Sequence, residues 1–403
     1  MPRKPRPRRR VGVLPGLLVA LSPVSQLGFT PVSVVLGERL DLSVGQVGLT
    51  VGVYAAAAAV ATAVLGPVVD LVAPRRVLPV AVTANVLLSA ALLLEPGYAG
   101  ILLARVLSGV ANSALVLCAA VVVADAHRDD PGGRDRGFSV LQTFTSLGAV
   151  AGLGLGAAAA GLGAPEVWSW TVVAYGLLVL ALTPLTVRRM PPVRSHVGGP
   201  AARAGLRTVV REASVALRVP RTAALLLAAA GVGWAIQATH YAVSLLAQEL
   251  DPPLAQRVAL SVMIPAGVFL GASANQVVLG RRSAEDLFRR AYPVLPVACA
   301  LLALVVGGRG NGAVALLLAL LVGLGTVLGV LMPLSPAVLV GRHPDLRGSV
   351  TAADSVAKGL GSTVSPVVLG AVAAASSLGG GFLLLAGVVA LAAVCARAQR
   401  ATV

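Results

Sequence analysis

The feature that most constrains this chain is a series of long runs without a charged residue. A helix needs about 20 predominantly apolar residues to cross the hydrocarbon layer of a bilayer. Nine runs near this size hold no charge, and a tenth holds only Arg105. Backbone amides in lipid must bond within their own segment, so each run predicts a membrane-spanning α-helix. The runs are 11–37, 42–69, 77–94, 96–124, 137–165, 167–187, 222–248, 258–280, 291–308 and 310–341.

The end of the chain adds two more predicted helices. The segment 348–396 is interrupted by Asp354 and Lys358, and the sequence "LGGG" at 378–381 divides it in two. Composition agrees with twelve spans, because only 12% of the residues are charged and the mean hydropathy is +0.88. A soluble domain is about a quarter charged. The expected fold class is therefore an all-α membrane protein with twelve transmembrane helices.

The basic residues predict how these helices are oriented. Six Lys and Arg precede the first run, and threading twelve spans from there puts 27 of the 32 basic residues on that side. The opposite side holds three, Arg39, Arg257 and Arg309. Because cytoplasmic loops carry the excess of Lys and Arg, both termini are expected in the cytoplasm, in a multi-pass protein of the cytoplasmic (inner) membrane. A first run of 27 residues followed by more spans favours an uncleaved helix over a secretory signal.

Several classes of protein are disfavoured by the same composition. The net charge of +16 fits loops that face anionic lipid headgroups, so membrane lipid rather than nucleic acid is the expected partner. Cys118, Cys299 and Cys395 all lie in apolar runs, which argues against disulfides and metal sites. No Gly-rich phosphate loop followed by Lys occurs. We therefore expect no metal, no cofactor and no enzymatic activity.

The chain also divides into two halves that have similar sequence segments at matching positions, and we call each matched pair an echo. "GPVVD" at 66–70 corresponds to "GASAN" at 271–275, and "RGFSVLQTFTSLG" at 136–148 corresponds to "RGSVTAADSVAKG" at 347–359, so that Arg-Gly is expected to open the fifth helix of each half. Repeated six-helix halves are a transporter architecture, which predicts two pseudo-symmetric six-helix bundles. The expected segments are a basic N-terminus (1–10), a first bundle (11–187), a linker (188–221), a second bundle (222–396) and a tail (397–403).

The linker contains Pro-Pro and Gly-Gly-Pro, and it is the longest hydrophilic stretch. Two interpretations stay open for it. Residues 203–217 form a short basic helix on the inner membrane surface, or the whole linker is a disordered tether.

Four residues near the end of the second predicted helix resemble a signature of the major facilitator superfamily. They are Gly66, Asp70, Arg75 and Arg76. The resemblance implies that Gly66 permits tight helix contact and that Asp70 and the basic residues form a cytoplasmic charge latch. It also implies that Asp125, at the end of the fourth helix, joins this latch. Charges at a membrane edge can pair in one conformation and separate in another.

Two further stretches extend the resemblance. "RVLSG" at 105–109 is similar to the family's fourth-helix signature, with Arg105 inside the membrane, where an Arg normally faces a cavity or a partner. The alternative is that Arg105 extends to the outer headgroups. Gly148, Gly152 and Gly156 resemble part of a fifth-helix signature of proton-coupled drug exporters. Plain helix packing by small residues explains that stripe equally well.

Six polar residues inside the predicted spans are candidates for ion coupling or substrate binding. His240 can titrate near neutral pH, although a single His in an apolar helix is more often a packing residue. Asp354 precedes Lys358 by four residues, the favourable order for pairing on one helix face. Gln26 and Gln237 are equally suited to bonds between helices. The set is Arg105, His240, Asp354, Lys358, Gln26 and Gln237.

The preferred function is a secondary transporter that exports a small, moderately apolar organic molecule by proton-coupled alternating access. Spans dominated by Ala, Leu, Val and Gly suit such a substrate better than a sugar or a phosphate ester. An ion-coupled uptake symporter is the first alternative, and a non-transporting membrane sensor or partner protein is the second. A monomer is expected. The identity of the substrate, the direction of transport and the coupling ion stay open at this point.

Overall fold

The computed structural model describes residues 13–42, 44–94, 97–189, 202–250, 253–279, 281–307 and 313–398. These residues form fourteen α-helices and one short 3-10 turn, η1 (Leu92–Leu94), and none of them lies in a strand. The predicted all-α fold class is confirmed for this part of the chain. The helices are α1 (Val13–Arg39), α2 (Val44–Leu71), α3 (Pro74–Ala91), α4 (Tyr98–Ala126), α5 (Pro131–Gly161), α6 (Pro165–Arg189), α7 (Ala202–Arg218), α8 (Pro220–Leu250), α9 (Leu254–Val278), α10 (Ala284–Ala291), α11 (Val294–Gly307), α12 (Ala313–Arg342), α13 (Arg347–Ala375) and α14 (Leu378–Ala398).

Ten stretches of this fold are long and apolar enough to cross a membrane. They include one that runs through α10 and α11, Ala284–Val306. Both α13 and α14 lie where the sequence predicts the last two spans, but neither is among the ten; the apolar part of α14, Gly379–Val394, is shorter. Asp354 and Lys358 lower the hydropathy of α13. The chain is therefore a multi-pass membrane protein with ten candidate spans among the described residues, and α13 and α14 pack against them.

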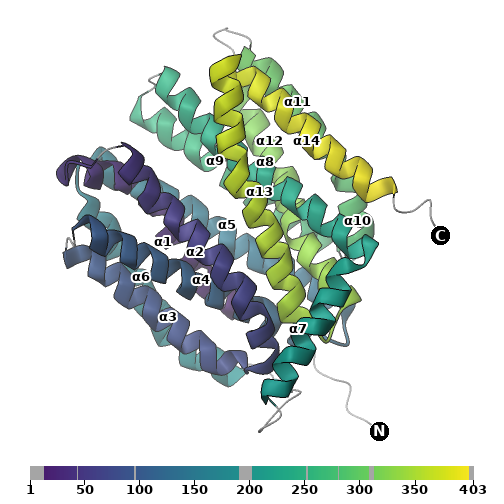
Figure 1. Cartoon of the computed structure of the whole chain (residues 1–403). Helices are drawn as coiled ribbons and strands as arrows, with labels where there is room; N and C mark the ends of the chain where they lie inside the picture. Colours follow the sequence, from purple (N-terminus) through teal and green to yellow (C-terminus); the bar gives the residue numbers. More distant parts are fainter. Residues whose placement is uncertain are drawn as a thin grey trace.

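The helices form two groups that lie side by side (Figure 1). We call α1 to α6 the N half and α8 to α14 the C half. Across the boundary α2 packs against α13, and α5 packs against α9. The expected N-terminal segment 1–10, residues 399–403 of the expected tail and residues 190–201 of the expected linker lie outside the described residues.

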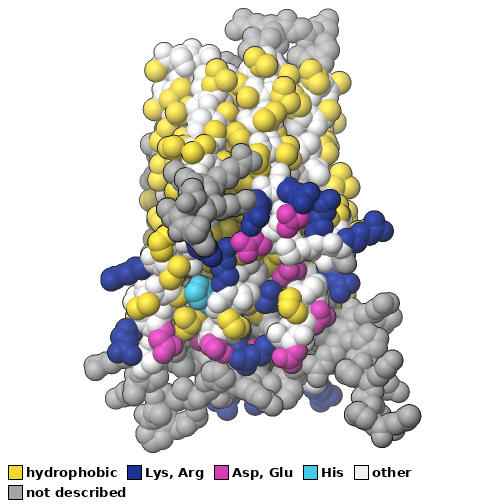
Figure 2. Space-filling view, turned by 90° about the vertical axis from the view of Figure 1, so that its right-hand side faces the viewer, with side chains coloured by type: hydrophobic (Ala, Val, Ile, Leu, Met, Phe, Trp, Pro, Cys, Tyr) yellow, Lys and Arg dark blue, Asp and Glu magenta, His cyan; other side chains and the backbone are white. Residues whose placement is uncertain are grey.

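One end of the molecule carries most of the charge, and we call it the charged end. It contains the connections α2–α3, α4–α5, α9–α10 and α12–α13. Ion pairs join several of these connections, such as Arg128 with Asp345 and Arg342 with Glu285. Figure 2 shows the charged side chains of one face gathered over this lower part, below a zone of mostly hydrophobic side chains. A zone of this kind suits the hydrocarbon of a bilayer.

The start of α5 differs from the prediction that Arg136-Gly137 opens this helix. The helix begins five residues earlier, at Pro131. Asp130 is the N-cap, and its side chain accepts a hydrogen bond from the backbone N of Gly133. An Asp at the N-cap followed by Pro at the first helical position is a favourable helix start. The helix begins there even though its first turn carries a positive charge and no acidic residue. The corresponding helix of the C half, α13, does begin at Arg347 as predicted.

In the N half, α1 and α5 approach so closely that their glycines are required. A Cβ at Gly148 would stand 2.5 Å from the backbone oxygen of Ala20, and one at Gly152 would stand 2.8 Å from that of Pro23. A Cβ at Gly156 would overlap the backbone of Gly28. The stripe of glycines therefore sits at a backbone-to-backbone contact, the arrangement that small residues allow between membrane helices.

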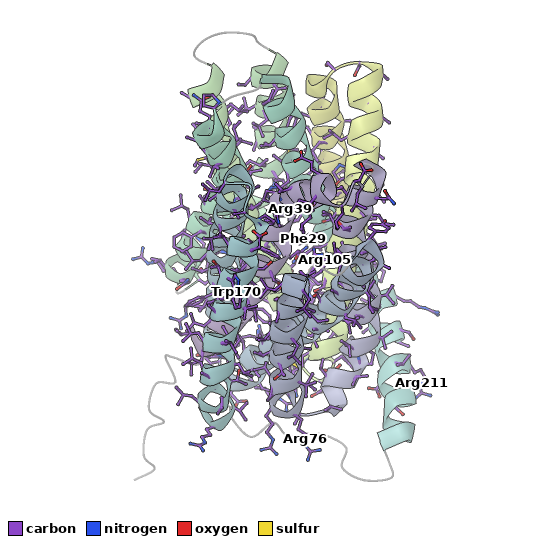
Figure 3. The ribbon with its side chains drawn as sticks, turned by 90° about the vertical axis from the view of Figure 1, so that its left-hand side faces the viewer. Phe29, Arg39, Arg76, Arg105, Trp170 and Arg211 are labelled. Carbon is purple, nitrogen blue, oxygen red and sulfur yellow. The ribbon has the colours of Figure 1, made fainter. Side chains whose placement is uncertain are left out.

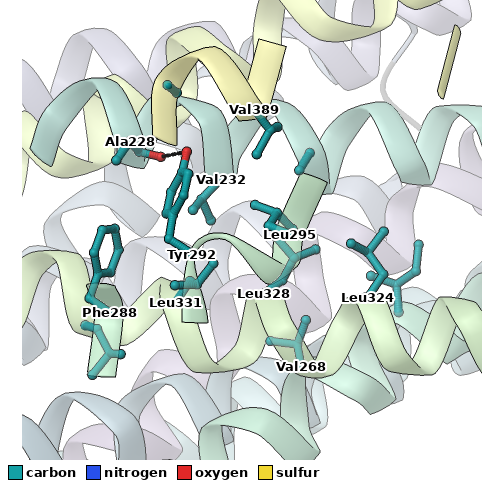
Figure 4. Close-up of a cluster of buried hydrophobic side chains, with 14 of the residues drawn as sticks. Ala228, Val232, Val268, Phe288, Tyr292, Leu295, Leu324, Leu328, Leu331 and Val389 are labelled. Carbon is teal, nitrogen blue, oxygen red and sulfur yellow. Dashed lines mark hydrogen bonds between the residues drawn. The ribbon is translucent and has the colours of Figure 1, made fainter. Parts of the chain in front are cut away.

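The C half has its own apolar core, part of which is shown in Figure 4. Leu295, Leu324 and Leu328 are fully buried in it. Tyr292, at the break between α10 and α11, donates a hydrogen bond of 3.0 Å to the backbone oxygen of Ala228 on α8. This bond satisfies the one polar atom of a buried Tyr side chain, so it fixes the break against α8.

The linker contains α7, so residues 203–217 are helical, and the location of this helix on the membrane surface stays a prediction. This helix packs against α2, α8 and α13, and Figure 1 shows it at the charged end, where the two halves meet. Ala213 and Ala216 are buried, whereas Arg211 and Arg218 are exposed. The helix therefore has a small-residue face toward the protein and a basic face away from it.

Candidate functional site

Asp70 lies in the last turns of α2, and its carboxylate binds the first turn of α13 in the other half. Oδ1 accepts a hydrogen bond from the backbone N of Gly348 (2.6 Å), and Oδ2 accepts bonds from the backbone N and the Oγ of Ser349 (2.9 and 2.8 Å). Unpaired N–H groups and the helix dipole favour a carboxylate at a helix N-terminus. Gly66, one turn earlier, faces the same helix, where a Cβ would overlap Ala352. We call this α2–α13 contact the charged seam.

Two ion pairs extend the charged seam to the end of α4. Arg347 Nη1 lies 2.9 Å from Asp125 Oδ1, with side-chain exposures of 7% and 11%. Arg128 Nη2 donates a hydrogen bond of 2.7 Å to Asp345 Oδ1 at the surface. Both pairs join the N half to the start of α13. Asp125 therefore lies beside Asp70 in one interface, as the resemblance implies.

The two arginines expected to pair with Asp70 lie elsewhere. Arg75 and Arg76 are exposed at the start of α3, and Figure 3 shows Arg76 at the lower tip of the N half. Pro74 occupies the first position of this helix, and no ion pair joins either arginine to Asp70 among the described residues. The cation that acts on Asp70 is Arg347 of the C half. The contacts of Asp70 therefore join the two halves rather than two neighbouring helices.

The corresponding contact on the other side of the boundary, between α5 and α9, carries no ion pair among the described residues. Gln276 Nε2 donates a hydrogen bond of 2.9 Å to Thr143 Oγ1 across it. Asn275, which corresponds to Asp70 in the sequence echo, donates a 2.9 Å bond to the backbone oxygen of Val330 in its own half. We call this α5–α9 contact the neutral seam.

Arg105 is buried inside the N half, near the middle of its height (Figure 3). Its Nε donates a hydrogen bond of 3.3 Å to the backbone oxygen of Thr50. Its guanidinium carbon lies 4.2 Å from the centre of the Phe29 ring and 4.5 Å from that of Tyr54. Only 2% of the residue is exposed, so its charge does not reach the headgroups. Three helices, α1, α2 and α4, therefore supply the surroundings of this cation.

Asp354 and Lys358 form the ion pair that their spacing predicts. Lys358 Nζ lies 2.6 Å from Asp354 Oδ2 and also donates a 2.9 Å hydrogen bond to the backbone oxygen of Met332 on α12. Asp354 is 2% exposed, and its Oδ1 accepts no hydrogen bond within the described residues. The pair lies on α13, the helix whose first turn binds Asp70, but deeper in the C half.

The remaining three candidates occupy separate places. Gln26 is half-buried on α1, Gln237 is exposed on α8, and His240 is half-buried one turn further along α8. Gln237 and His240 therefore lie in the C half, whereas Arg105 lies in the N half against Phe29, which follows Gln26 by one turn of α1. A role for them in binding stays a prediction.

His343 lies between α12 and α13, next to the charged seam. Its Nε2 lies 3.2 Å from Thr222 Oγ1 at the start of α8. Partial burial, together with the neighbouring charge of Arg342, lowers the pKa of the His343 imidazole below its usual value. No cluster of three or more metal-ligating side chains occurs among the described residues. The charged end is thus a site of ion pairs and helix ends.

Reasoning from the sequence missed the partners that surround the candidates. Nothing in the spacing of Phe29 and Tyr54 links them to Arg105, because they meet only once α1, α2 and α4 pack. Ser349 and Arg347 carried a usable signal, since both lie in the "RGS" that opens the second echo. That signal predicted where a helix begins, and the N-terminus of a helix is a favourable binding site for a carboxylate.

This chain is similar to known proteins in sequence and in structure. Residues 16–353 match the Major Facilitator Superfamily. The human organic anion transporter MFSD10 (TETRAN) has a similar structure, with a TM-score of 0.73 at 19% sequence identity, covering 98% of this chain and 100% of that one. The Escherichia coli fucose:proton symporter FucP has a TM-score of 0.75 at 15% identity, covering 96% and 98%. No curated protein sequence matches significantly. Sequence identities of 19% and 15% show that the two structures share a fold with this chain, and no more than the fold.

Proposed function

The chain belongs to the Major Facilitator Superfamily, and we propose that it is a secondary active transporter that moves a small organic molecule by alternating access. The observation that carries this proposal is the charged seam. Asp70 and Arg347 join two halves of the fold through contacts that form when the halves meet at the charged end and break when they part. A permanent contact between the halves would gain more stability from apolar packing, because a buried ion pair adds little net stability.

The charged end faces the cytoplasm in this proposal, and both termini lie on that side of twelve spans. The excess of basic residues on one side supports this orientation. With the charged seam made, the transporter is closed toward the cytoplasm. The protein is a monomer, and the basic face of α7 lies at the level of the anionic lipid headgroups.

Cysteine labelling tests this orientation in intact cells. Leu162, between α5 and α6, is 74% exposed, and Ser214 is exposed on α7. A membrane-impermeant thiol reagent should label Leu162→Cys and should miss Ser214→Cys until the cells are opened. The opposite pattern would reverse the proposed topology.

Transport is coupled to protons in this proposal, and the preferred direction is export. The sequence holds no nucleotide-binding loop, so an ion gradient is the available energy source, and Asp354 or Asp70 is a carboxylate that can take up the proton. Export rests on Gly148, Gly152 and Gly156, which resemble an exporter signature. Uptake by symport is the alternative, because a fucose:proton symporter shares the fold.

Membrane vesicles with an imposed pH gradient test the function and its direction together. Efflux predicts that lipophilic test compounds accumulate in inverted vesicles that are acidified inside, and that a proton uncoupler abolishes the accumulation. Accumulation only in right-side-out vesicles would establish uptake instead. Flux that matches vesicles without the protein, in both orientations, would contradict transport.

A further inference from the structure

Arg105 is a buried cation whose charge meets no carboxylate among the described residues. Three charged residues lie inside the apolar runs, namely Arg105, Asp354 and Lys358. The latter two bind each other on α13 in the C half. The charge of Arg105 is therefore the one that remains without compensation in the membrane interior, where burying a single charge is costly.

The contacts of Arg105 leave part of its guanidinium unused. Phe29 and Tyr54 lie with their rings against the guanidinium carbon, and Thr50 accepts a bond from Nε. Nη2 is buried and has no hydrogen-bond partner in the described part of the chain. Ring faces attract a cation, but they do not accept the in-plane bonds that an Arg offers to a carboxylate.

A second buried polar side chain lies on the same helix. Asn112 is 2% exposed, its amide lies at the hydroxyl of Tyr54, and part of its hydrogen-bonding capacity is unused within the described residues. It follows Arg105 by two helical turns, a rise of about 10 Å. Tyr54 lies beside both residues. Arg105, Asn112, Tyr54 and Phe29 therefore make up one group with spare polar atoms at both ends, which we call the Arg105 cluster.

We propose that the Arg105 cluster holds the anionic group of the transported molecule, so that the substrate class is an organic monoanion. The inference rests on the proposed transport function and names its substrate class. A carboxylate at Nη2 supplies the missing counter-charge and accepts the unused bond. Phe29 and Tyr54 pack against the apolar body, and Asn112 binds a neutral polar group further along. A neutral substrate would leave the buried charge uncompensated.

Entry to the cluster requires a side chain to move, because Arg105 is 2% exposed. Phe29 and Tyr54 cover the guanidinium and are themselves 1% and 3% exposed. Phe29 also packs against Trp168, with a distance of 5.7 Å between ring centres. The fluorescence of Trp168 is therefore expected to report when an anion displaces Phe29.

Thermal unfolding of the purified protein in a neutral detergent tests the proposal. The probes are two matched pairs, benzoate with benzamide and butyrate with butyramide, each at millimolar concentration. A ligand that binds only the native state raises the Tm. We expect each carboxylate to raise the Tm by several degrees and each amide to leave it unchanged. Arg105→Gln should abolish the shift, whereas Arg39→Gln, which alters an exposed arginine paired with Glu166, should keep it.

Several outcomes would overturn the proposal. They are equal shifts for acid and amide, no shift with either carboxylate, a shift that survives Arg105→Gln, or a shift that appears only on adding phospholipid. If Arg105→Gln does not fold, Arg105→Lys and the change in Trp168 fluorescence replace it. Lysine keeps the charge but lacks the planar donors, so we expect at least tenfold weaker binding. Flux of neutral compounds without carboxylate binding would refute this inference and leave the transporter proposal intact.

Discussion

The two seams between the halves occupy corresponding places and are built differently. At the charged seam, Asp70 accepts three hydrogen bonds from the start of α13, and an ion pair between Arg347 and Asp125 adjoins it. At the neutral seam, the bond from Gln276 to Thr143 joins uncharged groups, while beside this seam Asp135 at the start of α5 accepts a bond from the backbone N of Ala284 on α10. The echo of Asp70 is Asn275, which turns back to its own half. The position that holds the charged Asp70 at one seam thus holds the neutral Asn275 at the other.

The hydrogen bonds of the charged seam are also stronger than the bond of the neutral seam. Hydrogen bonds to a charged group contribute about 1.5–3 kcal/mol each, and a neutral bond contributes about 1 kcal/mol. Protonation of Asp70 or competition by another ion weakens only the charged seam. We therefore infer that the charged seam sets the balance between open and closed states, and that the neutral seam follows it as a passive contact.

The largest expected effect lies deeper on α13, the helix of the charged seam. Lys358→Met leaves Asp354 buried without its partner, which costs about 3–5 kcal/mol in the free energy of unfolding. Asp354→Asn together with Lys358→Gln removes both charges, so expression and folding should recover. Thermal unfolding and transport of both variants measure this.

The double variant also separates two roles of this pair. If Asp354 carries the coupled proton, the double variant folds but no longer responds to a pH gradient. Gradient-driven transport at the wild-type rate would remove Asp354 from the coupling mechanism and leave the pair as a means of inserting two charges.

Asp70→Asn is the sharpest test of the charged seam. The amide group of Asn places a donor where Gly348 and Ser349 also donate, so the seam loses about 3 kcal/mol, a factor of roughly 100 in the closed state. We expect normal insertion and transport that falls by at least tenfold. Ser349→Ala, which removes one of the three donors, should have a milder effect. Transport by Asp70→Asn at the wild-type rate would show that the latch assignment is wrong.

The neutral seam should tolerate the loss of its polar bond. Gln276→Leu with Thr143→Val removes both partners, and replacing both by apolar groups of similar shape is nearly neutral. Transport should stay within about twofold of wild type, given a change near 0.5 kcal/mol. A tenfold loss here would remove the distinction between the two seams.

The smallest expected effect concerns acid sensitivity at the charged end. The pKa of His343 is lowered in the folded protein by burial and by Arg342, so the unfolded chain binds the proton more readily. Stability from this group is present above the ordinary His pKa of about 6.5 and is lost as pH falls through the lower folded value. His343→Gln should flatten the decline in Tm between neutral and acidic pH. An unchanged decline would assign it to the carboxylates.

The sequence predicted the local features well and the distant partners poorly. Apolar runs placed the long helices, and the i to i+4 spacing placed the Asp354–Lys358 pair, because both depend on neighbours along the chain. Asp70 was found, but its partner was expected at Arg75 or Arg76 and lies 278 residues away at Gly348. The rings around Arg105 come from two other helices. Contacts of that kind depend on how helices pack, which spacing alone does not encode.

The distance across the charged seam tests the central claim most directly. Val72 and Pro344 are exposed on the two sides of this seam, and spin labels placed there in a cysteine-free protein report the separation by double electron–electron resonance. We predict a mainly short distance in the wild-type protein and in Gln276→Leu, and a large added population at longer distance in Asp70→Asn. A distribution for Asp70→Asn that matches the wild type, or one for Gln276→Leu that broadens as much, would contradict control of the gate by the charged seam.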